Sequence, residues 1–226
     1  MAGGGPQYEP VEDERLDPDS LLLDARKERI DEVVAKRTRA VVIVLDRLED
    51  AFNMAAVLRT SEAMGLQEVH VIEHPEFRFK PNGRVTQGCD KWLDIRIHQD
   101  FAACSQHLHS RGYKIWVSGI RPGGSSLFDL RFDEKIALVF GNERYGVSEE
   151  VLAGADGVFW IPMRGFSQSL NVSAAVSATI GRAIGWRTDK LGPQGDLSEQ
   201  ERESLTQRFQ MLSVKQRKKI YKTHTP

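Results

Sequence analysis

Three short segments of this chain place polar side chains and glycines within apolar surroundings, and they are the candidates for chemistry. In the first, Asn53 and Arg59 interrupt an otherwise apolar helical pattern. The second is Gly141-Asn142-Glu143, and the third is Ser169-Leu170-Asn171. Glycine lets a ligand approach the backbone closely, and an unpaired polar group inside an apolar helix costs about 1–3 kcal/mol. These residue types therefore indicate groups that pair with a ligand or with one another.

Each segment also has a purely structural interpretation. Asn53 and Arg59 lie six residues apart, which puts them about 120° apart around a helix, as expected of a helix-terminal polar group and a surface arginine. Ser169 could cap a helix while Asn171 bonds to nearby backbone. The chain has no G-x-G-x-x-G and no Walker P-loop, which disfavours a standard dinucleotide or nucleoside triphosphate site. No Ser/His/Asp or Cys/His constellation can be nominated.

The elements that must position these segments alternate along the chain. Apolar runs predict strands at 40–45, 68–73, 93–98, 113–118, 136–140 and 157–161, and helical patterns predict helices at 53–64, 100–111, 148–155 and 169–186, the last of them buried. Such alternation favours a parallel sheet with helices on both faces. A further amphipathic helix is expected at 21–38, and a polar one after the Gly192–Asp196 breaker.

Composition and charge narrow the class of protein. The chain has 226 residues, 40% hydrophobic and 28% charged, which suits one α/β domain with terminal additions. No run of eighteen apolar residues predicts a membrane span, and residues 1–20 carry no apolar signal core, so we expect a disordered extension and a cytoplasmic protein. A net charge of −1 does not itself indicate a nucleic-acid partner.

Metal binding is not expected. The two cysteines, Cys89 and Cys104, lack CxxC spacing, so neither a disulfide framework nor a zinc site is indicated. His107 and His109 form the nearest candidate ligand pair, but a surface helix explains them better because a structural zinc site takes four ligands.

Together the three segments resemble motifs one, two and three of the SPOUT superfamily, in its SpoU/TrmH branch of RNA ribose 2′-O-methyltransferases. The first match is Asn53 through Arg59, with Gly65 after it. The second runs from Phe140 through Ser148 to Met163, and the third is Ser169 through Ser173. Order, spacing and strand context agree over residues 40–186. The flanking helices further resemble those of the members that modify guanosine 18 of tRNA.

The resemblance implies a fold and a domain organisation. The expected fold is a parallel sheet with helices on both faces and a C-terminal deep trefoil knot, a rare exception to the rule against knotted chains, flanked by N- and C-terminal helices. The expected parts are an extension at 1–20, a basic helix at 21–39, the methyltransferase domain at 40–190 and a helical basic tail at 191–226. Members of the family are homodimers whose sites draw on both subunits.

The resemblance also implies an activity: transfer of a methyl group from S-adenosylmethionine to the ribose 2′-OH of a tRNA nucleotide, guanosine 18 of the D-loop. The alternatives are a ribosomal RNA substrate and a non-catalytic RNA-binding protein of the same fold. Residues that match the family's motifs are expected to have the family's roles. The expected cofactor contacts are Gly119, Gly141, Ile161, Met163, Ser169 and Leu170. The expected catalytic residues are Arg59, Asn53, Glu143, Ser169 and Asn171. Arg59 either activates the hydroxyl directly or, since a guanidinium is a poor base, holds a phosphate and stabilises alkoxide charge.

Basic residues near both ends of the chain are candidates for contacts to the tRNA backbone. Only 39 residues precede the first expected strand, too few for a separate RNA-binding domain, which favours tRNA over ribosomal RNA. The alternative is that these are ordinary solvated helix faces. The candidates are Arg26, Lys27, Arg29, Lys36, Arg37, Arg39, Lys215, Arg217, Lys218 and Lys219.

Overall fold

The structure is a computed structural model that describes residues 22–73, 86, 88–142 and 144–223, with side chains up to Val214. The chain divides into two compact units, Lys36–Asp196 and a smaller one formed by Met1–Ala35 with Leu197–Pro226. The larger unit is slightly longer at both ends than the expected domain of 40–190. No helix in the described ranges is long and apolar enough to cross a membrane.

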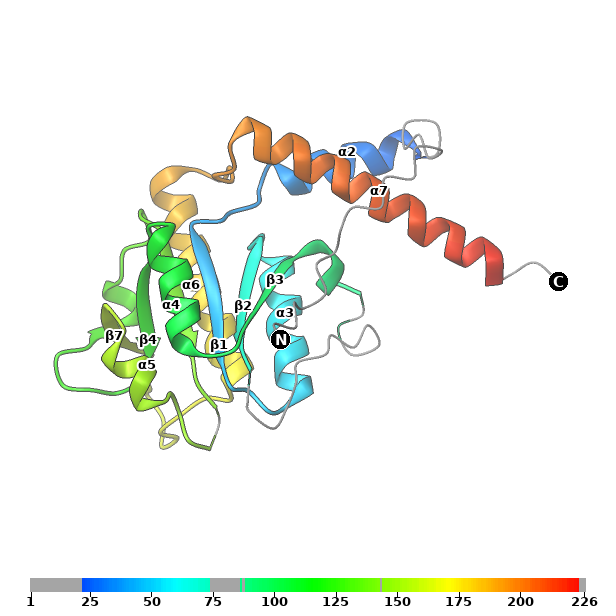
Figure 1. Ribbon diagram of the computed structural model, residues 1–226. Coiled ribbons are helices and arrows are strands. Elements are labelled where there is room, and N and C mark those ends of the chain that lie inside the picture. Colours follow the sequence, from blue (N-terminus) through cyan, green and yellow to red (C-terminus); the bar gives the residue numbers. More distant parts are fainter. Residues whose placement is uncertain (1–21, 74–85, 87, 143, 224–226) are drawn as a thin grey trace. The chain divides into compact units, whose positions relative to one another are not determined.

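The larger unit is built on a parallel sheet, as the sequence predicts (Figure 1). Within the described residues its seven strands lie in the order β3-β2-β1-β6-β4-β7-β5, and every neighbouring pair is parallel. The strands are β1 (Val41–Asp46), β2 (Glu68–Ile72), β3 (Asp94–His98), β4 (Lys114–Ser118), β5 (Ser125–Ser126), β6 (Ile136–Phe140) and β7 (Gly157–Trp160). The sequence analysis did not predict β5, because two serines carry no strand pattern.

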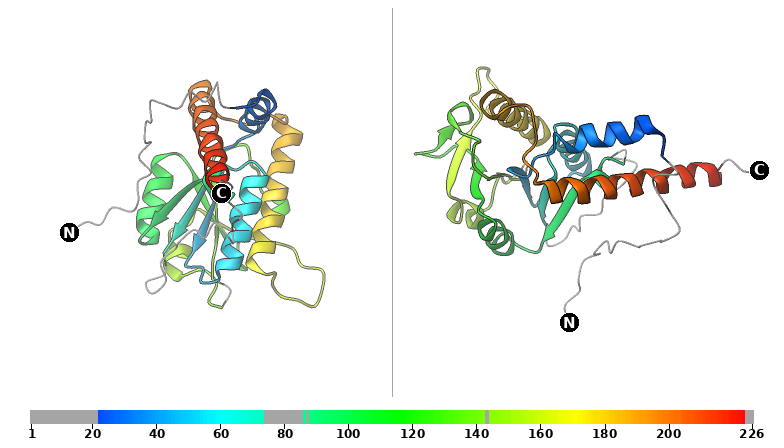
Figure 2. Two further views of the ribbon diagram at one scale, coloured as in Figure 1. Left: turned by 90° about the vertical axis from the view of Figure 1, so that its right-hand side faces the viewer. Right: turned by 90° about the horizontal axis from the view of Figure 1, so that it is seen from above.

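Helices cover both faces of this sheet (Figure 2). Helices α3 (Ala51–Ala63) and α6 (Val172–Leu191) lie on one face, and α4 (Phe101–Ser110) and α5 (Glu149–Ala153) lie on the other. Short 3₁₀ helices, η1 (Asp90–Trp92) and η2 (Leu127–Asp129), complete the unit. Two buried clusters result, one on each face, so the predicted three-layer arrangement is confirmed.

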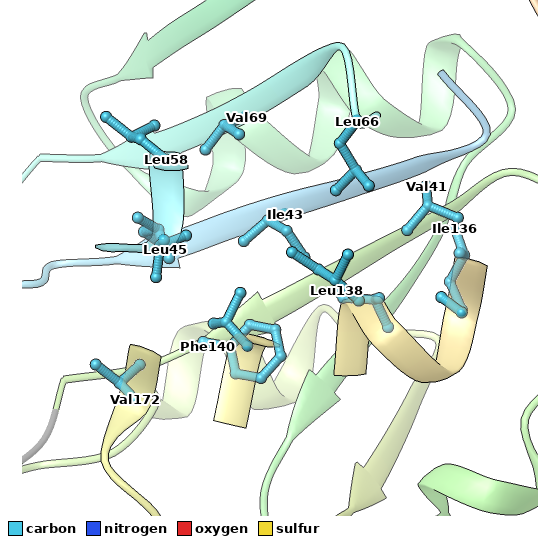
Figure 3. Close-up of a cluster of buried hydrophobic side chains, with 14 of the residues drawn as sticks. Val41, Ile43, Leu45, Leu58, Leu66, Val69, Ile136, Leu138, Phe140 and Val172 are labelled. Atoms are coloured by element: carbon cyan, nitrogen blue, oxygen red, sulfur yellow. The ribbon is translucent and has the colours of Figure 1, made fainter. Parts of the chain in front are cut away.

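Strand β1 shows why its sequence reads as a continuous apolar run. Val41, Ile43 and Leu45 point into the cluster under α3 and α6 (Figure 3), whereas Val42 and Val44 point into the cluster under α4. A strand covered on both faces needs apolar side chains at every position. All six residues of β1 are buried.

The order of the strands creates a switch point between β1 and β6. From β1 the chain builds β2 and β3 on one side, whereas β6, β4, β7 and β5 lie on the other. Open α/β sheets bind ligands outside the carboxyl ends of the strands, where the order reverses. The loops that follow β1, β6 and β7 lie at the lower edge of the sheet in Figure 1. The trefoil knot stays a prediction.

Helix α6 differs from its predicted bounds of 169–186. It begins at Val172 because Asn171 has extended backbone angles and caps the helix, and it ends at Leu191, before Gly192 with φ of +95°. Its buried residues are Val172, Val176, Thr179, Ile180 and Ala183. They form one side of the helix, so the predicted burial applies to that side, and the high Ala and Val content does not require burial all round.

The smaller unit pairs α2 (Asp24–Val34) with α7 (Glu199–Thr223). Nη2 of Arg26 donates to Oγ of Ser213 at 3.2 Å, which ties the two helices together. Helix α2 is shorter than the expected 21–38, because Thr38 already forms a parallel bridge with Leu66 in the larger unit.

A buried carboxylate organises one end of the sheet. The Glu68 side chain is fully buried at the start of β2, and it accepts hydrogen bonds from Arg39 (2.9 Å), Arg96 (2.7 Å) and Arg111 (2.5 and 2.9 Å). Burial alone would raise the pKa of this carboxyl, but its polar contact with His70 and the hydrogen bonds and charge of Arg111 outweigh it and hold the pKa well below its usual range. Glu68 therefore stays ionised and neutralises three cations, Arg39 before β1, Arg96 in β3 and Arg111 after α4.

We expect the Glu68→Gln substitution to lower the free energy of unfolding by about 2–3 kcal/mol at pH 7, because three guanidinium groups lose their counter-charge. This expected loss is smaller than the loss on breaking a fully buried ion pair, because the three arginines are partly exposed. Urea unfolding measures the change. Folding depresses the pKa of Glu68, so the difference in stability between the unaltered protein and the variant should be complete above about pH 4.3. It should shrink as the pH falls below that value.

Glu134→Gln is the matched control, because Glu134 forms an exposed ion pair with Lys114. It should leave the unfolding curve unchanged. Equal losses in the two variants would show that Glu68 contributes no more than a surface charge.

Candidate active site

Two of the predicted site residues meet across the helix N-termini. Asp50 caps α3 by accepting from the backbone N–H groups of Phe52 (2.7 Å) and Asn53 (3.2 Å), and this fixes Asn53 in the first turn. The side-chain amide of Asn171, at the start of α6, donates to Oδ1 of Asn53 at 3.0 Å. The first and third sequence segments, 118 residues apart, are thus joined by a direct hydrogen bond.

The carbonyl oxygen of the Asn171 side chain is also occupied. It accepts from the backbone N–H of Ser173 (2.9 Å) and Ala174 (3.4 Å) and from the hydroxyl of Ser173 (2.6 Å). Asn171, rather than Ser169, therefore caps the helix. The structural and the functional interpretations of Asn171 are compatible, because its oxygen serves the cap while its amide reaches Asn53.

A second polar contact joins α3 to α6 beside Arg59. The hydroxyl of Ser177 donates to the backbone oxygen of Ser173 at 2.7 Å, so it accepts the hydrogen bond from the Thr60 hydroxyl at 3.2 Å. Sequence reasoning missed this pair, because both residues look like ordinary polar positions in helices. The contact fixes the rotation of α3 one residue after Arg59.

Arg59 itself is exposed on α3. Burial and the negative charges of Asp90 and Glu62 raise the pKa of Cys89, while the positive charge of Arg59 opposes them, which places the guanidinium near η1. Among the described residues Arg59 makes no hydrogen bond or ion pair. The structure does not bring it into contact with Asn53, since six residues of helix span about 9 Å. Its charge is available to a ligand.

The loop after β6 is tied to the end of β1. The Asn142 amide donates to the backbone oxygen of Arg47 (3.1 Å) and to Glu49 (3.2 Å), and the Ser148 N–H donates to the buried Asp46 carboxylate (3.1 Å). Sequence reasoning included Asn142 in the second candidate segment but did not nominate Asp46, although a polar residue ending a buried strand was the available signal. The predicted catalytic residue Glu143 lies outside the described residues.

Gly141 begins this loop, and only glycine fits there. A Cβ atom at residue 141 would overlap the backbone oxygen of Gly146, which an antiparallel bridge between Asn142 and Gly146 brings back against the strand end. The loop from Gly141 to Gly146 therefore packs its own backbone against the carboxyl end of β6.

Exposed apolar groups gather near the neighbouring strand ends. Gly119 follows β4, and a Cβ atom there would meet no atom within 4 Å. Residues 162–170 are all exposed, including Met163 (36%), Phe166 (109%) and Leu170 (41%), and Ile161 just before them is half-buried. A pocket of about 450 Å³ is lined by Ile120, Arg121, Pro122 and Trp160. Exposed apolar side chains beside open backbone suit an organic ligand.

The predicted RNA-binding residues fall into different groups. The prediction for Arg37 is wrong: its side chain is only 1% exposed and donates to Glu62 and to the backbone oxygen of Leu66, so it cannot reach a phosphate. Arg39 is held by Glu68 and Asp94. Arg26, Arg29 and Lys36 are exposed and Lys27 is partly exposed. The side chains of Lys215, Arg217, Lys218 and Lys219 lie outside the described part of α7.

We expect the Gly141→Ala substitution to lower the free energy of unfolding by about 1–3 kcal/mol, because the loop backbone must shift to admit a methyl group. Gly185→Ala is the control: a Cβ atom there, inside α6, meets no atom within 4 Å, and alanine is the better helix former. Chemical denaturation should show a loss in the first variant and an equal or higher stability in the second. A loss in both, or in neither, would contradict this account of the loop.

Comparisons with known proteins agree with this geometry. The SpoU rRNA Methylase family model matches residues 40–180. The tRNA (guanosine(18)-2′-O)-methyltransferase of Thermus thermophilus is 34% identical over 160 residues, 71% of this chain and 82% of that protein. The enzyme of the same name from Borreliella burgdorferi is 34% identical over 195 residues, 86% of this chain and 88% of that protein.

Among solved structures, the chain resembles a TrmH/SpoU tRNA modifying enzyme of Aquifex aeolicus with a TM-score of 0.76 and 28% identity. The match covers 84% of this chain and 98% of that one. Family model, relatives and fold all agree, and the chain belongs to the SpoU methylase family.

Proposed function

We propose that this protein transfers a methyl group from S-adenosylmethionine to the ribose 2′-OH of guanosine 18 in tRNA. The observation that carries the proposal is the 3.0 Å hydrogen bond between Asn53 and Asn171, which assembles the first and third family motifs at the carboxyl edge of the sheet. Family membership makes the chain a methyltransferase. The names of the relatives from Thermus and Borreliella support guanosine 18 as the nucleotide.

The residues at this edge fit S-adenosylmethionine, which supplies an electrophilic methyl group when bound. Gly119 leaves the backbone open at the end of β4, and Gly141 lets the loop after the neighbouring strand β6 return closely against the strand end. The apolar side chains of Met163 and Leu170 are exposed to solvent. We assign the cofactor contacts to these four residues together with Ile161 and Ser169.

Methyl transfer to a hydroxyl requires alignment and removal of one proton. Arg59 carries a guanidinium that stays protonated at neutral pH, so we assign it the electrostatic role: it holds a phosphate of the substrate and stabilises charge developing on the 2′-oxygen. Asn53 and Asn171 hold each other in position and set the angle between α3 and α6. Ser169 and Glu143 complete the proposed catalytic set.

We further propose that the protein works as a cytoplasmic homodimer and that tRNA phosphates contact its basic helices. The exposed Phe166 and Leu170 support a partner surface near the site. Arg29 and Lys36 are exposed as phosphate contacts must be, and such contacts provide affinity without reading sequence.

The decisive experiment uses a tRNA transcript in which a single ribose is changed. The enzyme and S-adenosylmethionine should methylate the unmodified transcript, and 2′-deoxyguanosine at position 18 should abolish incorporation because the acceptor oxygen is missing. A transcript with 2′-deoxyguanosine at position 19 is the control and should be methylated. Methylation of the transcript that carries 2′-deoxyguanosine at position 18 would contradict the assigned nucleotide. So would methylation of ribosomal RNA in preference to tRNA.

Arg59→Lys should reduce kcat by at least about 10²-fold, because an ammonium group cannot reproduce the planar fork that binds phosphate in two places. Calorimetric affinity for S-adenosylmethionine should stay unchanged. Arg131→Lys is the control, since Arg131 is exposed and, among the described residues, pairs only with Asp133. Near-normal turnover of the Arg59 variant would show that this residue is only a surface charge with no part in catalysis.

A further inference from the structure

Three imidazole rings gather where α4 packs against β2 and β3. His70 comes from β2, His98 from the end of β3 and His107 from α4, and their ring centroids lie 5.1, 5.6 and 5.7 Å apart. Cys104, one turn before His107 on α4, is fully buried nearby. The sequence analysis predicted no metal site because these residues come from three elements and show no ligand spacing.

The donor atoms of three of these residues converge. One ligand atom each from His70, His98 and Cys104 lies within 4.8 Å of the other two, and Nδ1 of His70 lies 2.9 Å from Nε2 of His98. Donor atoms around a tetrahedral zinc ion, with bonds of about 2.0–2.3 Å, are roughly 3.3–3.8 Å apart. The 2.9 Å separation of the two ring nitrogens is that of a hydrogen bond, which a bound ion would replace by moving the two nitrogens slightly apart.

The second nitrogen of His70 already faces the partner that a metal-bound imidazole needs. Its Nε2 is buried and lies 3.1 Å from Oε1 of Glu68, without an aligned hydrogen-bond partner among the described residues. A metal-bound histidine usually donates its other N–H to a carboxylate. Glu68 itself is committed to Arg39, Arg96 and Arg111, so it suits this supporting role better than the role of ligand.

Solvent can reach one side chain of this group. His98 is partly exposed, whereas the other two candidate ligands, His70 and Cys104, are fully buried. A thiol that coordinates a metal ion is deprotonated by the ion.

We propose that His70, His98 and Cys104 bind one zinc ion, with water as the fourth ligand and Glu68 orienting His70. On binding, the Cys104 thiol releases its proton to solvent. His70 takes the tautomer protonated at Nε2, so that Nδ1 bonds the metal and Nε2–H faces Glu68. Two imidazoles and a thiolate suit zinc, a borderline-soft ion. The ion joins β2, β3 and α4, and the site is independent of the proposed methyltransferase reaction.

The test measures metal binding directly on the full-length protein after treatment with a chelator. Titration with Zn²⁺ against a chromophoric chelator should give one equivalent bound. Titration with Co²⁺ should produce a thiolate-to-metal charge-transfer band and the d–d bands of tetrahedral cobalt. Cys104→Ala should abolish the charge-transfer band, and His98→Ala should weaken binding of both ions at least tenfold.

His109→Ala and Cys89→Ser are matched controls. His109 lies on the same helix but is exposed and faces Asp156, and Cys89 is the other cysteine of the chain. Both should bind Zn²⁺ like the unaltered protein. Circular dichroism checks that each variant is folded, and His98→Ala, at a partly exposed position, decides the question if Cys104→Ala does not fold. Absence of a stoichiometric ion, or equal losses in His109→Ala and His98→Ala, would overturn the proposal.

Discussion

The parallel pairing of β1 with β6 is the constraint on which the rest of the larger unit depends. Their register runs from Val41 opposite Ile136 to Leu45 opposite Phe140, and both strands are buried along their whole length. Because this pair lies where the strand order reverses, the loops after β1 and β6 leave the sheet side by side. Asn142, in the second of the sequence segments that carry polar groups, thereby reaches the backbone oxygen of Arg47 just after β1.

Side chains that serve the fold also serve the candidate site. Asp50 and Asn171 satisfy the free N–H groups at the starts of α3 and α6, a common arrangement. The same two caps orient Asn53 and hold it against Asn171. Asp46 and Asn142 tie the loop after β6 to the end of β1 in the same way. Arg59, in contrast, makes no polar contact among the described residues, as a group reserved for a ligand should.

Charged and apolar side chains gather at different places around the sheet. At the start of β2, Glu68 accepts from three guanidinium groups and lies 3.1 Å from His70, which stacks with His98 at the end of β3. In the segment that follows β7, Met163, Phe166 and Leu170 are exposed. The first group has the ligands and counter-charges of an ion site. The second has apolar surface that an organic cofactor or a partner subunit would cover.

Local pattern in the sequence determined most of the architecture. Apolar runs at β1, β2 and β6 predicted buried parallel strands, and the helical patterns at 100–111 and 148–155 predicted α4 and α5, which Asp100 and Ser148 cap. Three motifs in the right order were enough to identify the family. These signals are local, because strand burial and helix capping depend on residues close together in the chain.

Tertiary structure alone decided which distant polar groups meet. The pairing of Asn53 with Asn171, the burial of Arg37 and the gathering of His70, His98 and Cys104 each join elements that are far apart in sequence. In the sequence, Arg37 looks like one more basic residue of a charged helix, and only the fold shows that it is buried beside Glu62. No periodicity or spacing encodes such contacts, since they arise from the packing of helices on a sheet and from the desolvation of the charges enclosed there.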